Sequence, residues 1–364
     1  MSEGHETILV AGAGIAGLGA ALALGDGTRE VTILDRDPPP PELSPDEAFY
    51  RWERKGATQL RHSHAFLGRL TALIRDRHPK LMEELLAEGT RLFGFRDGLP
   101  PPLSGKYRAA QGDDDLMLLF SRRTTLELVM RRYASRLPGV RFVTGAGVRG
   151  LIARRENGTI LVEGLKVERD GTLAEMRADL IIDATGRNTA FPDWLRAEGP
   201  VIEEEESPCG ILYFTRHYRL REGQDEPPWD GTPGGGDLGY IKYGVFIADN
   251  RHFSVTLATP EIETELRLAV VKPAVFDAAC MAPARRGALD ESLARRAGQP
   301  GFRHGQSAKR LAAFYEGWAA ASARLLRAGR CGHPHESALR PRLRLRRGGS
   351  ASAARSAGCD ARSF

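Results

Sequence analysis

The first part of the chain alternates short apolar runs with segments of helical period. Residues 8–11 and 31–34 are almost entirely apolar, which is typical of strands buried in a parallel sheet, and residues 18–24 predict a helix between them. A proline-rich loop at 38–47 follows. Further on, the pattern predicts helices at 65–77 and 81–87, with an interruption at Pro79. A strand is then predicted at 116–120, followed by a helix that is capped by Thr124 or Thr125 and ends at about residue 137. A further strand is predicted at 140–143. Together these elements predict a doubly wound parallel sheet.

The pattern changes to period two between residues 148 and 178. Asn157-Gly158 and Asp170-Gly171 mark its reversals, and such pairs are strong hairpin signals, so this stretch predicts a three-stranded antiparallel meander. A last buried strand is expected at residues 180–182. Strands of a separate sheet are then predicted at residues 211–220, 239–250 and 252–259, and helical character returns at 261–281.

The fold class is therefore α/β: a Rossmann-like nucleotide-binding domain with an antiparallel β insert, plus a second β-sheet domain that binds substrate. The predicted division is 1–195 for the first domain, 196–280 for the second, 281–295 for a return to the first, and 296–364 for a basic tail without an apolar period.

A glycine-rich turn joins the first predicted strand to the first helix. Gly12, Gly14 and Gly17 form G-x-G-x-x-G, where the glycines permit a tight turn, backbone approach to a pyrophosphate and close helix packing. Asp35 ends the second strand, where a carboxylate can accept hydrogen bonds from ribose hydroxyls. An acid there favours FAD or NAD over NADP, while plain structural packing is the alternative. The predicted site also includes Ile15, Ala16 and Arg36.

Composition narrows the setting of the protein. The chain of 364 residues shows no secretory signal and no apolar run long enough to span a membrane. Its four cysteines are scattered without C-x-x-C pairs, which predicts a reducing cytoplasm and no metal site. Residues 296–364 carry 14 Lys and Arg against three Asp and Glu, whereas the preceding residues carry 38 against 44, so the basicity does not predict a nucleic-acid partner. The pattern specifies no oligomeric state.

Four motifs resemble those of one enzyme family. They are GAGIAG (residues 12–17), QLRHSHAFL (59–67), SRRTTLE (121–127) and ADLIIDATGRNTAFPDWL (178–195). Together they resemble the FAD-dependent monooxygenases with the p-hydroxybenzoate hydroxylase fold, in particular the squalene-epoxidase-like and polyether-epoxidase-like branch. The resemblance implies that FAD is the cofactor, that NAD(P)H is the reductant, and that O2 hydroxylates or epoxidises a small organic substrate.

The resemblance also implies roles for individual residues. Arg61 and Arg123 would contact the flavin nucleotide, and Asp183 with Gly186 would meet its pyrophosphate region. The alternatives are solvated arginines and, for Asp183, a turn cap. The i, i+2 spacing of His62 and His64 suits zinc poorly, so His64 is expected to line the substrate pocket. Tyr213 and Tyr243 are further pocket candidates, although strand aromatics are more often core residues. No catalytic residue is assigned, because the chemistry belongs to the cofactor.

Two other functional classes fit the same motifs. One is a flavin-dependent reductase of the geranylgeranyl-reductase type, which saturates alkenes without O2. The other is a non-enzymatic nucleotide-binding fragment. Oxygen uptake separates the first from a monooxygenase, and flavin absorbance separates the second from both.

The tail departs from the family pattern. A third motif, G-D-A-x5-P-x2-G-x-G, is expected near residues 310–350 and is missing. Codons for residues 317–343 are compatible with GFFALGDAxTHTNPLYGRGC within a reading frame shifted by one base, so we hypothesise a frameshift near Arg296. A genuine basic tail that binds nucleic acid or a membrane is the alternative. If the frameshift is real in the cell, this polypeptide is expected to bind FAD weakly or not at all and to show little activity.

Overall fold

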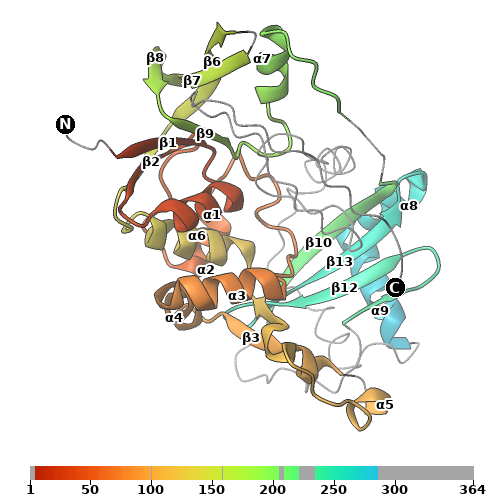
Figure 1. Ribbon diagram of the computed structural model, residues 1–364. Helices are drawn as coiled ribbons and strands as arrows, with labels where there is room; N and C mark the ends of the chain where they lie inside the picture. Colours follow the sequence, from red (N-terminus) through yellow and green to blue (C-terminus); the bar gives the residue numbers. More distant parts are fainter. Residues whose placement is uncertain (1–4, 100, 158, 205–208, 221–233, 286–364) are drawn as a thin grey trace, which may run out of the picture.

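The computed structural model describes residues 5–99, 101–157, 159–204, 209–220 and 234–285, so the predictions for 296–364 lie outside the described residues. Its first half is built on a parallel sheet with strand order β5-β2-β1-β9 (Figure 1). The strands are β1 (Glu6–Ala11), β2 (Arg29–Asp35), β5 (Val140–Thr144) and β9 (Leu180–Asp183). All of their pairings are parallel, which confirms the βαβ prediction for the N-terminal region.

Helices cover one face of this sheet. They are α1 (Ile15–Leu24), α3 (Gly68–Arg77), α4 (Pro79–Ala87) and α6 (Arg123–Ala134). Ile8 and Ile33 of the sheet pack against Leu18 of α1, Leu85 of α4 and Leu126 of α6, and all five are at most 1% exposed. Burial of a side chain of this size contributes about 2 kcal/mol, so this layer holds the helices to the sheet.

The other face is covered by the predicted meander. Its strands are β6 (Ala146–Glu156), β7 (Thr159–Arg169) and β8 (Thr172–Arg177), followed after β9 by α7 (Phe191–Ala197). Leu9 and Leu34 of the parallel sheet pack here against Leu165 and Phe191. Asp170 and Gly171 have φ of 51° and 76°, as the hairpin signal requires. The meander is therefore confirmed, and this half has three layers.

A second, antiparallel sheet with order β10-β13-β12-β11 lies beside this half (Figure 1). Its strands are β10 (Ile211–Arg219), β11 (Gly235–Asp237), β12 (Lys242–Ile247) and β13 (His252–Pro260). The helical character predicted for 261–281 corresponds to two helices, α8 (Thr264–Val270) and α9 (Pro273–Arg285), because Pro273 begins a new helix. Phe276 of α9 packs in one core with Phe214 and Leu257.

Three local predictions are wrong. The strand at 116–120, β4 (Met117–Phe120), pairs antiparallel with β3 (Arg91–Gly94) and is not in the parallel sheet. Thr124 and Thr125 lie inside α6, whose N-cap is Arg122. Within the loop predicted at 38–47, α2 (Pro45–Arg51) begins with a capping box between Ser44 and Glu47. The remaining short helices are η1 (Phe95–Gly98), α5 (Pro101–Ser104) and η2 (Asp113–Asp115).

None of the helices in the described ranges is both long enough and apolar enough to cross a lipid bilayer.

Candidate nucleotide site

The three glycines of the G-x-G-x-x-G turn have different surroundings. A Cβ on Gly12, which has φ of 105°, would collide with the backbone of Ala184, and a Cβ on Gly17 would collide with the carbonyl of Gly12. Gly14 caps α1, and among the described residues nothing lies within 4 Å of its Cβ position. Gly12 and Gly17 are therefore needed for packing, whereas Gly14 borders open space at a helix N-terminus. The neighbouring Ile15 and Ala16 form the first turn of α1, which has free amide groups by its geometry.

The turn after β9 lies against this glycine turn. Asp183 is buried, and its carboxylate accepts hydrogen bonds from the Thr185 amide at 2.9 Å and from the Thr185 and Thr189 hydroxyls at 2.6 Å. Asp183 thus acts as a turn cap that shapes the backbone next to Gly12. Gly186 has φ of 89°, and no atom of the part of the chain that the structure describes lies within 4 Å of its Cβ position. The structure therefore brings Gly14 and the β9 turn to the same edge of the parallel sheet.

Asp35 ends β2 at this edge, but it is enclosed by protein. Its carboxylate lies 3.4 Å from the Arg54 guanidinium and 3.6 Å from that of Arg131, and it accepts a hydrogen bond from the Asp37 amide. Burial raises the pKa of the Asp35 carboxyl, and Arg54 opposes that rise. The sequence predicted the strand end correctly, but the structure commits this side chain to arginines of the chain itself.

Arg54 connects the components of the site, although no sequence motif indicates such a role for it. Its guanidinium donates to the Asp37 carboxylate at 3.0 Å and to the carbonyl of Ala13, within the glycine turn, at 3.3 Å. It also lies 3.7 Å from Glu127 of α6. Burial lowers the pKa of this guanidinium, but Asp35 and Glu127 outweigh that effect and raise it. Arg54 therefore stays charged and ties the glycine turn to β2 and α6.

Two of the three arginines predicted near the nucleotide, Arg61 and Arg36, have backbone carbonyls as partners. Arg61 donates to the carbonyl groups of Phe49, Tyr50 and Trp52, which end α2. Arg36 is exposed and donates to the carbonyl of Lys55 at 2.9 Å. Arg61 thus satisfies orphan carbonyls at a helix C-terminus, a structural task.

Arg123 and His64 meet at the start of α6. Arg123 pairs with Glu127 at 2.6 Å and lies 3.3 Å from Nε2 of His64. The Nδ1 atom of His64 is 2.8 Å from the carbonyl of His62, which can only accept, so Nδ1 carries the proton and Nε2 accepts from Arg123. Burial and the Arg123 charge lower the pKa of His64 to about 3. This imidazole is therefore neutral at pH 7.

The segment that carries His62 and His64 packs on a polar face of the second sheet. Hydroxyl groups connect the two: Ser63 lies 2.6 Å from Ser254 and 2.7 Å from Thr256, and Thr215 lies 2.8 Å from Thr256. Nδ1 of His62 is 3.1 Å from the Thr215 hydroxyl. These contacts fix the predicted pocket-lining segment against strands β10 and β13.

The two candidate tyrosines are not brought together. Tyr213 shares a face of β10 with Thr215 and therefore faces the 61–66 segment, because side chains two residues apart point the same way. Tyr243 lies in the opposite core with Phe214 and Leu257, under α8 and α9. Only Tyr213 lies on the face turned toward the parallel-sheet half.

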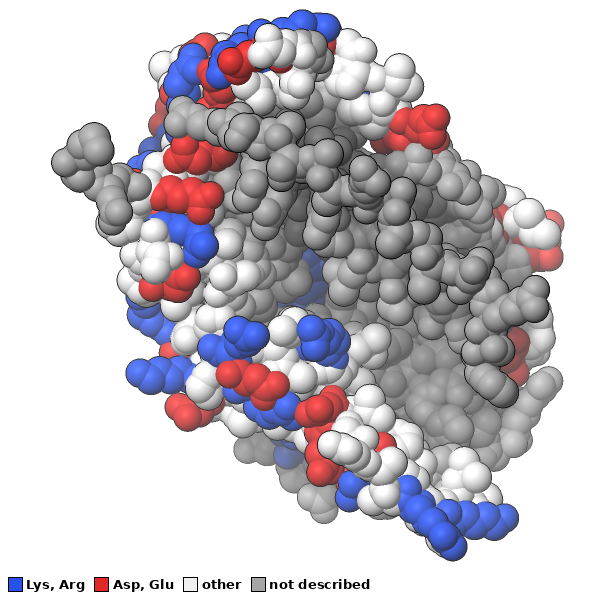
Figure 2. Space-filling model, in the orientation of Figure 1, with Lys and Arg blue, Asp and Glu red and all other residues white. Residues whose placement is uncertain are grey.

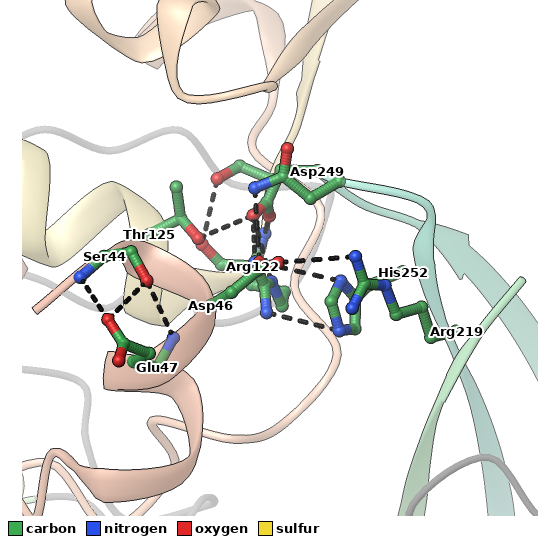
Figure 3. Close-up of polar contacts among 10 residues, drawn as sticks. Ser44, Asp46, Glu47, Arg122, Thr125, Arg219, Asp249 and His252 are labelled. Carbon is green, nitrogen blue, oxygen red and sulfur yellow. Dashed lines mark hydrogen bonds and ion pairs between the residues drawn. The ribbon is translucent and has the colours of Figure 1, made fainter. Parts of the chain in front are cut away.

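A buried ionic cluster joins α2, α6 and the turn between β12 and β13 (Figure 3). Asp249, fully buried, accepts hydrogen bonds from the Arg122 amide at 2.5 Å, from the Arg122 guanidinium at 2.5 and 3.0 Å, and from the Thr125 hydroxyl at 2.7 Å. Asp46 of α2 also pairs with Arg122, and His252 lies beside both. Sequence reasoning missed this cluster, because its members are far apart in the chain.

Among the residues that the structure describes, no group of three or more His, Cys, Asp and Glu side chains could hold a metal ion. Figure 2 shows acidic and basic side chains intermixed over the described part of the face in view.

Comparison with known proteins supports the fold. No protein-family model matches the sequence. Protein Rv3254 of Mycobacterium tuberculosis is 28% identical over 225 residues, which are 59% of this chain and 45% of that protein. The chain therefore matches less than half the length of this curated relative.

Solved structures resemble the chain over most of its length. PqsL, a probable FAD-dependent monooxygenase from Pseudomonas aeruginosa, aligns with a TM-score of 0.52 and 15% identity over 88% of this chain and 74% of PqsL. The 2-methyl-3-hydroxypyridine-5-carboxylic acid oxygenase aligns with a TM-score of 0.52 and 14% identity over 82% of this chain and 69% of that protein. The myxobacterial FAD-dependent halogenase CndH aligns with a TM-score of 0.52 and 15% identity over 82% of this chain and 60% of CndH. The chain has the fold of FAD-dependent monooxygenases, as the motifs predicted.

Proposed function

We propose that this protein is an FAD-dependent monooxygenase that uses NAD(P)H and O2 to hydroxylate or epoxidise a small organic molecule. The observation that carries the proposal is the glycine turn: neighbouring backbone occupies the Cβ positions of Gly12 and Gly17, whereas no described residue comes within 4 Å of that of Gly14 at the N-terminus of α1. A turn open at one glycine only is what close backbone approach by a pyrophosphate requires.

The residues present fit a dinucleotide at this edge of the sheet. The amide groups around Gly14 to Ala16 would hold the pyrophosphate, and Gly186 leaves room beside them. FAD, when bound, supplies the redox chemistry. The chain itself supplies orientation: Arg54 holds the turn through Ala13, and Arg123 with the neutral His64 forms a polar wall toward the second sheet.

The expected contact between Asp35 and the ribose is the part of the motif that this structure fits least well. Asp35 is shared between Arg54 and Arg131, so its carboxylate accepts from a ribose hydroxyl only if it gives up part of these contacts. The proposal therefore depends on the glycine turn more than on Asp35.

The test is a titration of the purified protein with FAD, in which flavin fluorescence reports binding. It compares the wild type with one variant and a matched control. Gly14→Ala puts a methyl group into the open space and is expected to weaken FAD binding about tenfold or more. Gly19→Ala adds the same methyl in the same helix, also with nothing within 4 Å, and should bind FAD as the wild type does. Equal affinities in all three proteins, or no binding at all, would overturn the assignment.

Oxygen consumption then separates the enzyme classes. NADH or NADPH oxidation coupled to O2 uptake indicates a monooxygenase. Reduction of a carbon–carbon double bond in the substrate without O2 uptake indicates a reductase of the geranylgeranyl-reductase type. A protein that takes up FAD but turns over neither nicotinamide would favour the nucleotide-binding fragment. Reading the gene's nucleotides tests the frameshift hypothesis separately, since a shifted frame without the third motif would end it.

A further inference from the structure

The tip of the β12–β13 hairpin packs against the parallel-sheet half through polar contacts with α2 and α6. Asn250 and Arg251 have φ of 51° and 64°, and the His252 amide donates to the Asp249 carbonyl at 3.0 Å, as in a tight two-residue turn. Asn250 also donates to Asp46 of α2 at 3.2 Å. This turn, residues 248–251, is called the docking turn below.

Asp249 of the docking turn sits at the N-terminus of α6. One carboxylate oxygen accepts from the backbone amide of Arg122, the N-cap, and the other accepts from the hydroxyl of Thr125 in the first helical turn. A buried carboxylate here is favoured by the helix dipole as well as by the Arg122 guanidinium (Figure 3). The second sheet therefore supplies the anion that holds the start of α6.

Contacts continue from the start of α6 to the glycine turn. Arg123 pairs with Glu127 one helical turn later, at 2.6 Å, and the other oxygen of Glu127 lies 3.7 Å from Arg54. Arg54 in turn donates to the carbonyl of Ala13, between Gly12 and Gly14. Glu127 and Arg54 are buried, so these contacts are shielded from solvent.

We propose that Asp249 is a positioning residue for the nucleotide site: through α6, Glu127 and Arg54 it fixes the glycine turn, and so couples the second sheet to nucleotide binding. The part that concerns FAD rests on the proposed function. The part that concerns the glycine turn does not rest on the proposed function, because every contact from Asp249 to Ala13 is made between residues of the protein itself. Loss of the Asp249 charge should loosen residues 12–17, although they lie in a different half of the molecule.

The test compares Asp249→Asn with Asp170→Asn by amide hydrogen exchange and by FAD titration. Asp170 is a matched control because it has φ of 51° in the turn of another hairpin and its side chain is 91% exposed. We expect D249N to speed exchange in residues 12–17 about tenfold and to weaken FAD binding by a similar factor, while D170N changes neither. A general loss of stability would speed exchange in β6–β8 equally, and that result would overturn the proposal.

A double-mutant cycle tests the route. If the effect passes through Glu127, D249N adds little to Glu127→Gln, so the combined effect on exchange in residues 12–17 is well below the product of the two. Additive effects would overturn the route. Should either variant fail to fold, Thr125→Val and Arg123→Gln replace them. The first removes the hydrogen bond from Thr125 to Asp249, the second removes the contacts of Arg123 with Glu127 and His64, and both keep the Asp249–Arg122 pair.

The two proposals can fail separately. If the wild type does not bind FAD, the proposed function fails and hydrogen exchange still decides the role of Asp249. If the wild type binds FAD and D249N matches it in both affinity and exchange, the role of Asp249 fails and the proposed function stands.

Discussion

The carboxylate of Asp35 lies 3.4 Å from the guanidinium of Arg54, and both side chains are buried. Arg54 also faces Asp37 and Glu127, so one cation is shared by three carboxylates in the interior, with Arg131 beside Asp35 and Arg123 beside Glu127 supplying further positive charge. This arrangement explains how the end of β2 and the middle of α6 are held at a fixed spacing beneath the glycine turn. It also means that the two members of the pair are not equivalent.

Replacing Arg54 should therefore cost more stability than replacing Asp35. Arg54→Met leaves three buried carboxylates without their shared cation, and we expect a loss of about 3–5 kcal/mol in the free energy of unfolding. Asp35→Asn leaves Arg54 with Asp37 and Glu127, so a loss of about 1–2 kcal/mol is expected. Urea unfolding measures both. Arg149→Met, which breaks an exposed pair with Glu168, is the control and should change stability by less than about 0.5 kcal/mol. A larger loss for D35N than for R54M would contradict this account.

Arg61 offers a test of a role implied by resemblance. Its donors are taken by three carbonyl groups at the end of α2, an arrangement that a lysine ammonium does not reproduce. Arg61→Lys is expected to lower the free energy of unfolding by about 1–2 kcal/mol and to leave FAD affinity unchanged. Arg36→Lys, whose side chain has a backbone carbonyl as acceptor in an exposed position, is the comparison. Weaker FAD binding by R61K with unchanged stability would instead support direct contact with the nucleotide.

Four histidines near the interface between the two halves predict acid sensitivity. Burial, with nearby arginines, lowers the pKa of His62 and His252 to about 4 and that of His64 and His217 to about 3. The unfolded chain takes up protons at these groups below about pH 6.5, whereas the folded chain does not, so stability is lost as pH falls toward the folded pKa values.

The expected size is about 2 kcal/mol at pH 5 for each such histidine, relative to pH 7.5. Urea unfolding between these pH values measures the slope. His217→Gln should make the slope shallower by close to one proton, because His217 accounts for one of the four groups. A slope that H217Q leaves unchanged would show that His217 is already protonated or exposed in the folded protein.

Elements with local signals could be predicted from the sequence. The buried strands around Gly12 and the reversal at Asp170-Gly171 carry their own turn chemistry, so both were predicted correctly. The partner of β4 could not be predicted from the sequence. More than twenty residues separate β3 from β4, and their pairing depends on tertiary contacts such as the bridge between Phe66 and Leu119. The start of α2 was not predicted. Ser44 and Glu47 have the spacing of a capping box, but the prolines that precede them are typical of a loop.

Within the candidate site, too, some features could be predicted from local sequence and others could not. The open glycine turn follows from the spacing of Gly12, Gly14 and Gly17, whereas the partners of Asp35 do not follow from any spacing. Asp249 and Arg122 are separated by 127 residues, so only the folded chain shows that they form a pair. Charged residues in a sequence are usually solvated, and nothing in the local pattern identifies those few that are buried.

The glycine turn gives a prediction that separates folding from binding. Gly17→Ala would place a methyl group against the carbonyl of Gly12, and Gly12→Ala would place one against Ala184 while requiring a left-handed backbone. Both should lower the free energy of unfolding by about 3 kcal/mol or more, because backbone atoms cannot move aside as a flexible side chain can. Gly14→Ala meets no atom and should keep wild-type stability within about 0.5 kcal/mol while losing nucleotide affinity. Urea unfolding without added nucleotide distinguishes these cases, and a G17A protein as stable as the wild type would mean that α1 does not pack on β1 as described.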